Sequence, residues 1–205
     1  LAARFVAARE ISGDFYDWYR APGGRVVFTL GDVMGKGLEA ALMMATARAA
    51  LRGSAAIEPM EAGIKQAAGV MAAALEANHA FVTVFQGCYD PATGDLSYVD
   101  AGHGHARVLR GQAGQDLLAE RSAPIGMFSD SRFVQGRASL EAGDTLVVFS
   151  DGLLDLRPDL STRDVLLPLE ARRAGSAQEV VDILADGARH EDLADDVTVV
   201  ALRRL

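Results

Sequence analysis

The sequence predicts an α+β fold in which antiparallel β-sheets are covered by helices. Short runs rich in β-branched and aromatic residues recur along the chain, separated by turns that contain Gly, Pro and Asp, which is typical of successive hairpins. Two blocks of helix-forming residues interrupt these runs. The chain has 205 residues, 50% of them hydrophobic, so we expect one globular domain over residues 1–205 with a substantial core.

The first half is predicted to contain three strands followed by two helices. The strands are expected at residues 4–9, 15–20 and 25–30, and the helices at residues 38–51 and 59–78. Gly53 and Ser54 are expected to end the first helix. Its apolar residues recur every three to four positions at Leu38, Leu42, Ala45 and Ala49, which is typical of a helix.

The second half is predicted to be mostly β-structure. Strands are expected at residues 81–85, 96–99, 105–110, 116–119, 133–140 and 145–149, with a last strand that starts at Asp196. Two further helices are expected at residues 164–173 and 176–188. Ser176 followed by Glu179 predicts a capped start for the second of them.

Charge and composition exclude several classes of function. A formal net charge of −8 argues against nucleic acid or an anionic membrane as the main partner. The single Cys88 excludes an internal disulfide and a cysteine-built zinc site. No apolar run approaches the length of a membrane span and no signal peptide is visible, so we expect a cytoplasmic domain. Because residue 1 is Leu, we expect a domain excised from a longer signalling protein, which could itself be membrane-anchored.

The first candidate site is Asp32, which follows a buried-type strand and is bracketed by Gly31, Gly35 and Gly37. Three interpretations compete. A phosphate-binding P-loop is excluded because the glycine spacing is too short and Gly37 replaces the required hydroxyl. Asp32 could simply form the turn or cap the following helix. The third interpretation, a metal ligand, requires further carboxylates elsewhere in the chain.

Those carboxylates are present at the ends of other predicted strands. Asp14 precedes the second strand, Asp151 follows the strand at 145–149, and Asp195 and Asp196 open the last one. Four elements that each place an Asp at a strand end favour one shared site over separate turns. Carboxylates and backbone carbonyls select hard cations, so we expect Mg²⁺ or Mn²⁺ rather than zinc or copper.

The chain resembles the PP2C-like (PPM) metal-dependent serine/threonine phosphatases, in particular the bacterial SpoIIE/RsbU-type phosphatase domains that relieve anti-sigma-factor control. The matching motifs, in the family's order, are Ser12-Gly13-Asp14-Phe15-Tyr16-Asp17, Gly31-Asp32-Val33-Met34-Gly35-Lys36-Gly37, Ala101-Gly102-His103, Pro124-Ile125-Gly126, Ser150-Asp151-Gly152 and Asp195-Asp196-Val197-Thr198-Val199. Two positions depart from the family pattern. Ser12 stands where a second glycine is usual, and Gly104 where an Asn is common.

The resemblance implies a four-layer α-β-β-α sandwich and a site with two Mn²⁺ or Mg²⁺ ions. It makes Asp32 the ligand that bridges both ions, aided by the Val33 carbonyl. Asp14 then serves one ion, and Asp151 and Asp195 serve the other, with Asp32 and Asp151 central to catalysis. Asp196 is expected to be a cap or an acceptor that supports the ligands.

The implied function is hydrolysis of phosphoserine or phosphothreonine on a small regulatory protein of the anti-anti-sigma-factor type. The resemblance also implies an upstream sensor or activator that acts through the helix after Asp32, so substitutions at Ala47 or Leu51 are expected to change turnover. A homodimer is left open. The alternative is a phosphatase-like module that has lost catalysis and only binds or senses, although all four expected aspartates are present.

Several other polar residues have two interpretations each. His103 is either a general acid or a residue that fixes the turn at 101–104, and the second role is the commoner one for such a histidine. Lys36 either contacts the substrate phosphate or is a solvated turn lysine, and Arg9 is a weaker phosphate candidate. Asp17 and Asp155 are expected to be solvated or to cap helices.

Overall fold

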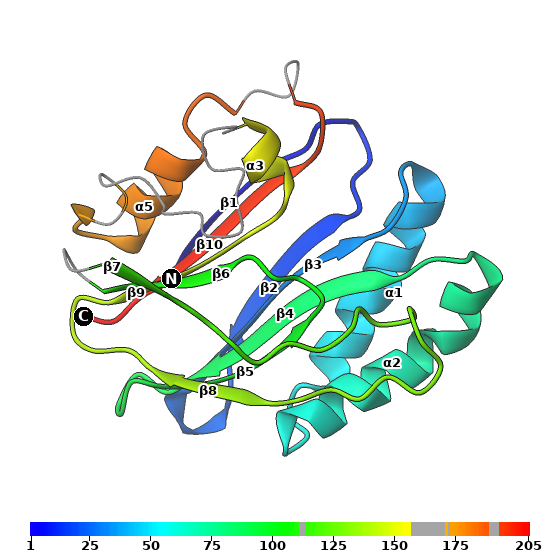
Figure 1. Ribbon diagram of the computed structural model, residues 1–205, viewed down its shortest axis with the longest axis horizontal. Coiled ribbons are helices and arrows are strands. Elements are labelled where there is room, and N and C mark those ends of the chain that lie inside the picture. Colours follow the sequence, from blue (N-terminus) through cyan, green and yellow to red (C-terminus); the bar gives the residue numbers. More distant parts are fainter. Residues whose placement is uncertain (111–113, 157–170, 172, 189–192) are drawn as a thin grey trace. The chain divides into compact units, whose positions relative to one another are not determined.

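The computed structural model describes residues 1–110, 114–156, 171, 173–188 and 193–205. Within these residues the chain divides into two compact units. Unit 1 consists of Leu1–Glu10, His105–Leu118 and Leu140–Leu205, and unit 2 of Ile11–Gly104 and Ala119–Ser139. Each unit contains one antiparallel sheet together with helices (Figure 1), which confirms the predicted α+β class.

Unit 2 is a five-stranded sheet with two helices packed against it. The strands lie in the order β2 (Asp14–Arg20), β3 (Val26–Val33), β4 (Val82–Tyr89), β5 (Asp95–Ala101) and β8 (Gly136–Ser139). A 3-10 turn, η1 (Pro22–Gly24), joins β2 to β3. Helix α1 (Leu38–Ser54) packs on β2 and β3, and α2 (Met60–Ala77) packs on β5 and on α1.

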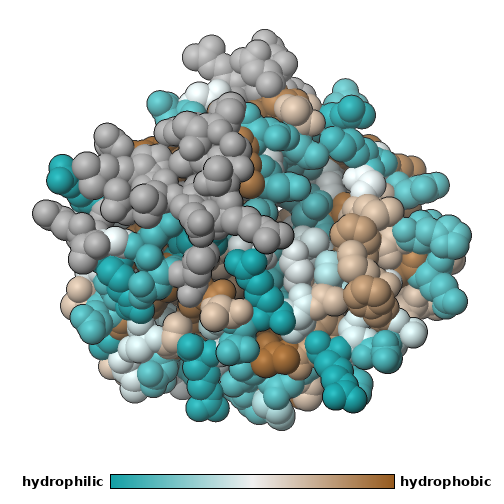
Figure 2. All heavy atoms as spheres, viewed as in Figure 1, coloured by the Kyte–Doolittle hydropathy of each residue, from teal (hydrophilic) through white to brown (hydrophobic). Residues whose placement is uncertain are grey.

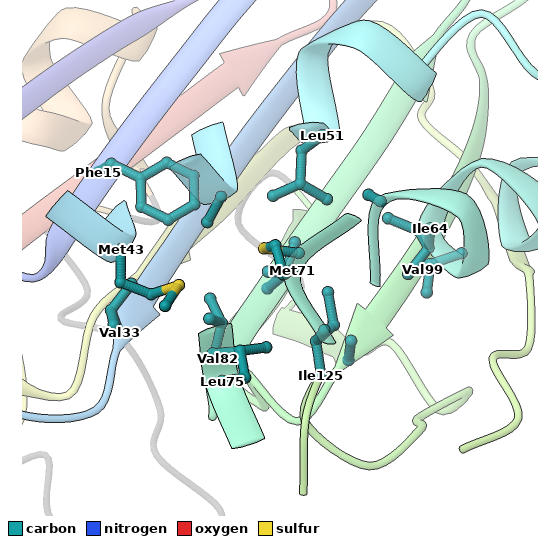
Figure 3. Close-up of a cluster of buried hydrophobic side chains, with 14 of the residues drawn as sticks. Phe15, Val33, Met43, Leu51, Ile64, Met71, Leu75, Val82, Val99 and Ile125 are labelled. Atoms are coloured by element: carbon teal, nitrogen blue, oxygen red, sulfur yellow. The ribbon is translucent and has the colours of Figure 1, made fainter. Parts of the chain in front are cut away.

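The core of unit 2 forms where the helices meet the sheet. Figure 3 shows Phe15 and Val33 from the sheet among Met43, Leu51 and Met71 from the two helices. These side chains are at most 8% exposed, so their burial holds α1 against the strands that carry Asp14 and Asp32.

Unit 1 is a second five-stranded sheet. Its strands lie in the order β1 (Ala2–Val6), β10 (Val197–Arg203), β9 (Thr145–Phe149), β6 (Ala106–Arg110) and β7 (Gly114–Leu117). Helix α3 (Gly152–Leu156) packs on β10, and α5 (Ala177–Leu184) packs on β10 and β1. Ser176 caps α5 as predicted, because its Oγ accepts the backbone N–H of Glu179 at 3.1 Å.

Most predicted elements are confirmed, and the differences have physical causes. The first strand lies at Ala2–Val6 rather than at 4–9, because it pairs with β10 only over that range. Helix α1 ends at the predicted break, with Ser54 as its last residue, but it runs past the predicted bound at residue 51. It can include Gly53 because a single helical glycine costs only about 1 kcal/mol. The short helix α3 was not predicted. The helix predicted at 164–173 lies largely outside the described residues.

The apolar spacing that predicts α1 does not mark its buried side. Leu38 and Leu42 are 65% and 63% exposed, whereas Met43, Ala47 and Leu51 are at most 8% exposed. Apolar residues occur on both sides of this alanine-rich helix, so their spacing alone does not fix which side faces the sheet. Figure 2 shows brown and tan residues among teal ones where Figure 1 draws α1.

No helix in the described part of the chain has both the length and the apolar character needed to span a bilayer.

Candidate metal centre

Strands β2 and β3 place two predicted ligands opposite each other. Asp14 pairs with Asp32 in the antiparallel register, so both side chains lie on the same face of the sheet. The sequence predicts that Asp32 lies in a turn after the strand. In the structure Asp32 is part of β3. Asp14 is only 5% exposed, and its backbone N–H donates to Ser12 Oγ at 3.0 Å. Thus Ser12, which departs from the family pattern, helps to hold the strand end that carries Asp14.

Gly13 lies close to two oxygen atoms, those of the Val33 carbonyl and the Asp32 carboxylate. A Cβ atom at Gly13 would lie 2.7 Å from the Val33 carbonyl oxygen and 3.2 Å from Asp32 Oδ1. The Val33 N–H donates to the Gly13 carbonyl at 3.3 Å, which keeps the two segments in contact. Because glycine has no side chain, the space between these oxygens stays open. The carboxylate and the carbonyl predicted to act together therefore face one small cradle.

In unit 1, hydrogen bonds join the end of β9 to the start of β10. The Ser150 N–H donates to the Thr198 carbonyl at 2.9 Å, and the Thr198 N–H donates to Ser150 Oγ at 2.9 Å. Ser150 Oγ in turn donates to the Asp196 carbonyl at 3.0 Å. A Cβ atom at Gly152 would lie only 2.1 Å from that carbonyl oxygen. This close approach places Asp151 next to the backbone of Asp195 and Asp196.

The two neighbouring aspartates at the start of β10 have different contacts. Asp196 Oδ1 accepts the backbone N–H of Ala8 at 2.8 Å, which ties the chain after β1 to the start of β10. Asp195 Oδ1 accepts the N–H of Asp196 at 2.9 Å, a contact within its own turn. Asp196 thus accepts a backbone hydrogen bond, while its proposed role beside the ligands and the choice of Asp195 as ligand remain predictions.

The donor atoms suit a hard divalent cation in kind. Among the residues that the structure describes, no group of three or more His, Cys, Asp or Glu side chains is placed to hold a metal ion. Unit 2 contains two of the predicted carboxylates and the carbonyl, namely those of Asp14, Asp32 and Val33. Unit 1 contains the carboxylates of Asp151 and Asp195. Oxygen donors of this kind fit Mg²⁺ or Mn²⁺, while the joint two-ion centre stays a prediction.

The loop around His103 is fixed by a residue that the sequence analysis missed. Asp100 is 1% exposed, and its Oδ1 accepts the backbone N–H groups of His103 at 2.8 Å and of Gly104 at 3.1 Å. Arg121 Nη2 donates to the Gly104 carbonyl at 3.1 Å. The only signal in the sequence is that an Asp directly precedes Ala101-Gly102-His103. His103 is itself buried, at 6% exposure.

Asp17 is neither solvated nor a helix cap. Its carboxylate accepts two hydrogen bonds from Arg52 Nη1, at 2.8 and 2.7 Å, and lies 3.6 Å from Arg48 Nη2. The hydrogen bond that Arg52 donates to Asp17 raises the pKa of the Arg52 guanidinium, which also lies 4.6 Å from the centre of the Tyr19 ring. These contacts fasten α1 to β2. Asp155, by contrast, is exposed as expected.

Comparisons with known proteins agree with this architecture. A sequence model of the family described as "Stage II sporulation protein E (SpoIIE)" matches residues 22–205. Phosphoserine phosphatase RsbU of Bacillus subtilis (strain 168) is 29% identical over 214 residues, which cover 100% of this chain and 63% of RsbU. The chain thus spans less than two thirds of that relative.

Two solved structures show the same fold. The PP2C phosphatase domain of SpoIIE from Bacillus subtilis, solved with a fragment of its regulatory domain, matches with a TM-score of 0.80 at 20% identity, over 98% of this chain and 60% of that one. The catalytic domain of the serine/threonine protein phosphatase PstP, solved with two manganese ions, matches with a TM-score of 0.71 at 20% identity, over 98% and 95%. The chain is therefore a member of the SpoIIE family, and its fold is PP2C-like.

Proposed function

We propose that residues 1–205 form one phosphatase domain that hydrolyses phosphoserine or phosphothreonine in proteins and depends on Mn²⁺ or Mg²⁺. The observation that carries this proposal is the cradle at Gly13, where the Val33 carbonyl and the Asp32 carboxylate face one open space beside Asp14. The names of the relatives support it, since RsbU is a phosphoserine phosphatase and PstP was solved with two manganese ions.

In this proposal, strand pairing and backbone hydrogen bonds position the residues that would hold the ions. Asp32, aided by the Val33 carbonyl, would hold both ions, and Asp14 would hold one of them. Asp151 and Asp195 would hold the other ion. When bound, two such ions activate water for in-line attack on the phosphoryl group and neutralise its charge. The β2–β3 register and the β9–β10 hydrogen bonds hold the backbone of the residues that would carry these oxygens. Because the nucleophile would be water, no covalent phospho-enzyme is required.

The substrate we propose is a small phosphorylated regulatory protein of the anti-anti-sigma-factor type. The motif resemblance supports this class, and the net charge of −8 disfavours nucleic acid as a competing partner. We further propose that an upstream sensor or activator domain controls the site through α1, which begins six residues after Asp32. The domain is proposed to act in the cytoplasm, without direct membrane contact.

Hydrolysis of p-nitrophenyl phosphate tests the activity without knowledge of the natural substrate. The purified chain is stripped with EDTA, and Mn²⁺, Mg²⁺ or Zn²⁺ is then titrated back. We expect turnover with Mn²⁺ or Mg²⁺, little with Zn²⁺ and none in the chelated protein. Asp32→Asn, checked by circular dichroism to be folded, is the inactive control. A folded wild-type chain that binds Mn²⁺ but never turns over would favour the binding or sensing module instead.

A further inference from the structure

A cavity of about 700 Å³ lies within unit 2, between α2 and the segment at residues 126–133. Both ends of this segment are fixed. Next to its start, Ile125 exchanges two backbone hydrogen bonds of 2.9 Å with Val82, beyond the C-terminal end of α2. After its end, Gln135 Oε1 accepts the N–H of Met60, the first residue of α2, at 2.9 Å. The segment therefore runs antiparallel to α2, and we call the space between them the α2 groove.

The walls of the α2 groove are mostly apolar. Helix α2 contributes the small residues Ala68, Gly69 and Ala72, whose size leaves the groove open. The opposite segment contributes Met127 and Phe128, which are 43% and 58% exposed. Large side chains exposed beside a hollow of this size mark a surface that can bury apolar groups of a partner.

Two residues of the α2 groove, Gly69 and His79, are not the residue types that would stabilise α2 most at their positions. Gly69 is inside α2, and a Cβ atom there would meet no atom within 4 Å, so Ala would fit and add about 1 kcal/mol of helix stability. His79 follows the helix end with a φ of +49°, a conformation in which Gly is usual. Both residues line the groove. Gly69 leaves the groove open and His79 places an imidazole at its end, and both residues lower the stability of the helix.

The charges along the α2 groove have opposite signs at its two ends. Lys65 and Glu76 both line it, and they are eleven positions apart in the helix, a rise of about 16 Å. Neither forms an ion pair with another residue in the described part of the chain. The C-terminal carbonyls of α2 add to the negative potential at the Glu76 end.

We propose that the α2 groove binds an extended segment of a partner protein, with an apolar centre, an acidic residue for Lys65 and a basic residue for Glu76. About six extended residues span the 16 Å between the two charges at about 3.3 Å each. A compact small molecule would leave one of the charges unused. This proposal goes beyond the phosphatase activity, and direct binding tests it whether or not the chain is active.

A displayed library of random eight-residue peptides, selected on the folded chain, tests the proposal. We expect enriched peptides to carry an acidic and a basic residue about five positions apart, with apolar residues between them. Synthetic copies should bind Gly69→Leu at least 10-fold more weakly by fluorescence polarisation, because the leucine fills the groove. Lys65→Glu and Glu76→Lys should each weaken binding about 3- to 10-fold at low salt.

The matched control is Gly53→Leu, which makes the same change in α1, where a Cβ atom also meets no atom within 4 Å. It should bind the peptides as the wild type does, and Gly69→Leu should keep wild-type hydrolysis of p-nitrophenyl phosphate. Peptides that bind Gly69→Leu equally well, or a selection with no enrichment, would overturn the proposal. Binding of 1-anilinonaphthalene-8-sulfonate that Gly69→Leu abolishes, without any peptide binding, would make the groove a small-molecule site and also overturn it.

Discussion

Replacing Gly13 by Ala is expected to weaken Mn²⁺ binding without removing any ligand. Gly13 does not have a positive φ angle, so an alanine at this position would not strain the backbone. The new methyl group, however, would lie 2.7 Å from the Val33 carbonyl oxygen and 3.2 Å from Asp32 Oδ1. Any effect on the metal would therefore come from the space that the methyl group takes.

The size of the effect follows from these distances. The contact with the Val33 oxygen falls about 0.7 Å short of an ordinary van der Waals distance of 3.4 Å, so β3 or the segment at Gly13 must shift by a comparable amount. Metal–oxygen distances tolerate only about 0.2 Å. We expect the Mn²⁺ affinity to fall about 10- to 100-fold, as for other changes beside ligands, and the free energy of unfolding to fall by about 1–3 kcal/mol.

Isothermal titration calorimetry with Mn²⁺ measures the affinity, and urea unfolding of the metal-free protein measures the stability. Gly53→Ala is the matched control, since its methyl group meets open space in α1. A folded Gly13→Ala protein with wild-type Mn²⁺ affinity and turnover would refute the reasoning, because the cradle at Gly13 would then not adjoin a metal ion.

Three further predictions concern the aspartates, α1 and the cysteine. With Mn²⁺ and p-nitrophenyl phosphate, the expected losses of turnover, from largest to smallest, are those of Asp32→Asn, then Asp151→Asn and Asp195→Asn, then Asp196→Asn and Asp17→Asn. A larger loss for Asp196→Asn than for Asp195→Asn would show that Asp196, and not Asp195, is the metal ligand. Leu51→Ala is expected to lower the free energy of unfolding by about 2–5 kcal/mol and Leu42→Ala by at most about 0.5, in urea titrations, because Leu51 is 1% exposed and Leu42 63%. Burial raises the pKa of the Cys88 thiol above its usual range, so iodoacetamide should alkylate it more slowly than free cysteine at pH 8, with the rate still rising at higher pH; an equal rate at pH 8 would contradict this.

Local sequence patterns predict where the strands and helices lie in the chain better than they predict which side of a helix is buried. The β-branched runs and the turn residues predict nearly every strand, because these preferences act within a few residues. The rotation of α1 is different. Its buried side, with Met43, Ala47 and Leu51, is selected by packing against β2, β3 and α2, and no local pattern states which apolar side meets them.

The residues of the candidate site are likewise predictable from the sequence, whereas the contacts that hold them are not. Sequence motifs identify the aspartates, and the register of β2 and β3 places Asp14 opposite Asp32. The partners that hold the surrounding backbone were not predictable, because they join residues far apart in the chain. Arg52 reaches Asp17 across 35 positions, and Ala8 donates to Asp196 across 188. Such pairs depend on the tertiary fold and leave no local pattern.

Anomalous diffraction from a crystal soaked in Mn²⁺ tests the central claim most directly. The proposal predicts two manganese peaks close together, with oxygen ligands at about 2.1 Å. Asp32 should contact both ions, Asp14 one of them, and Asp151 and Asp195 the other. Peaks that avoid Asp32, or a single ion held without Asp151 and Asp195, would contradict the two-ion phosphatase site.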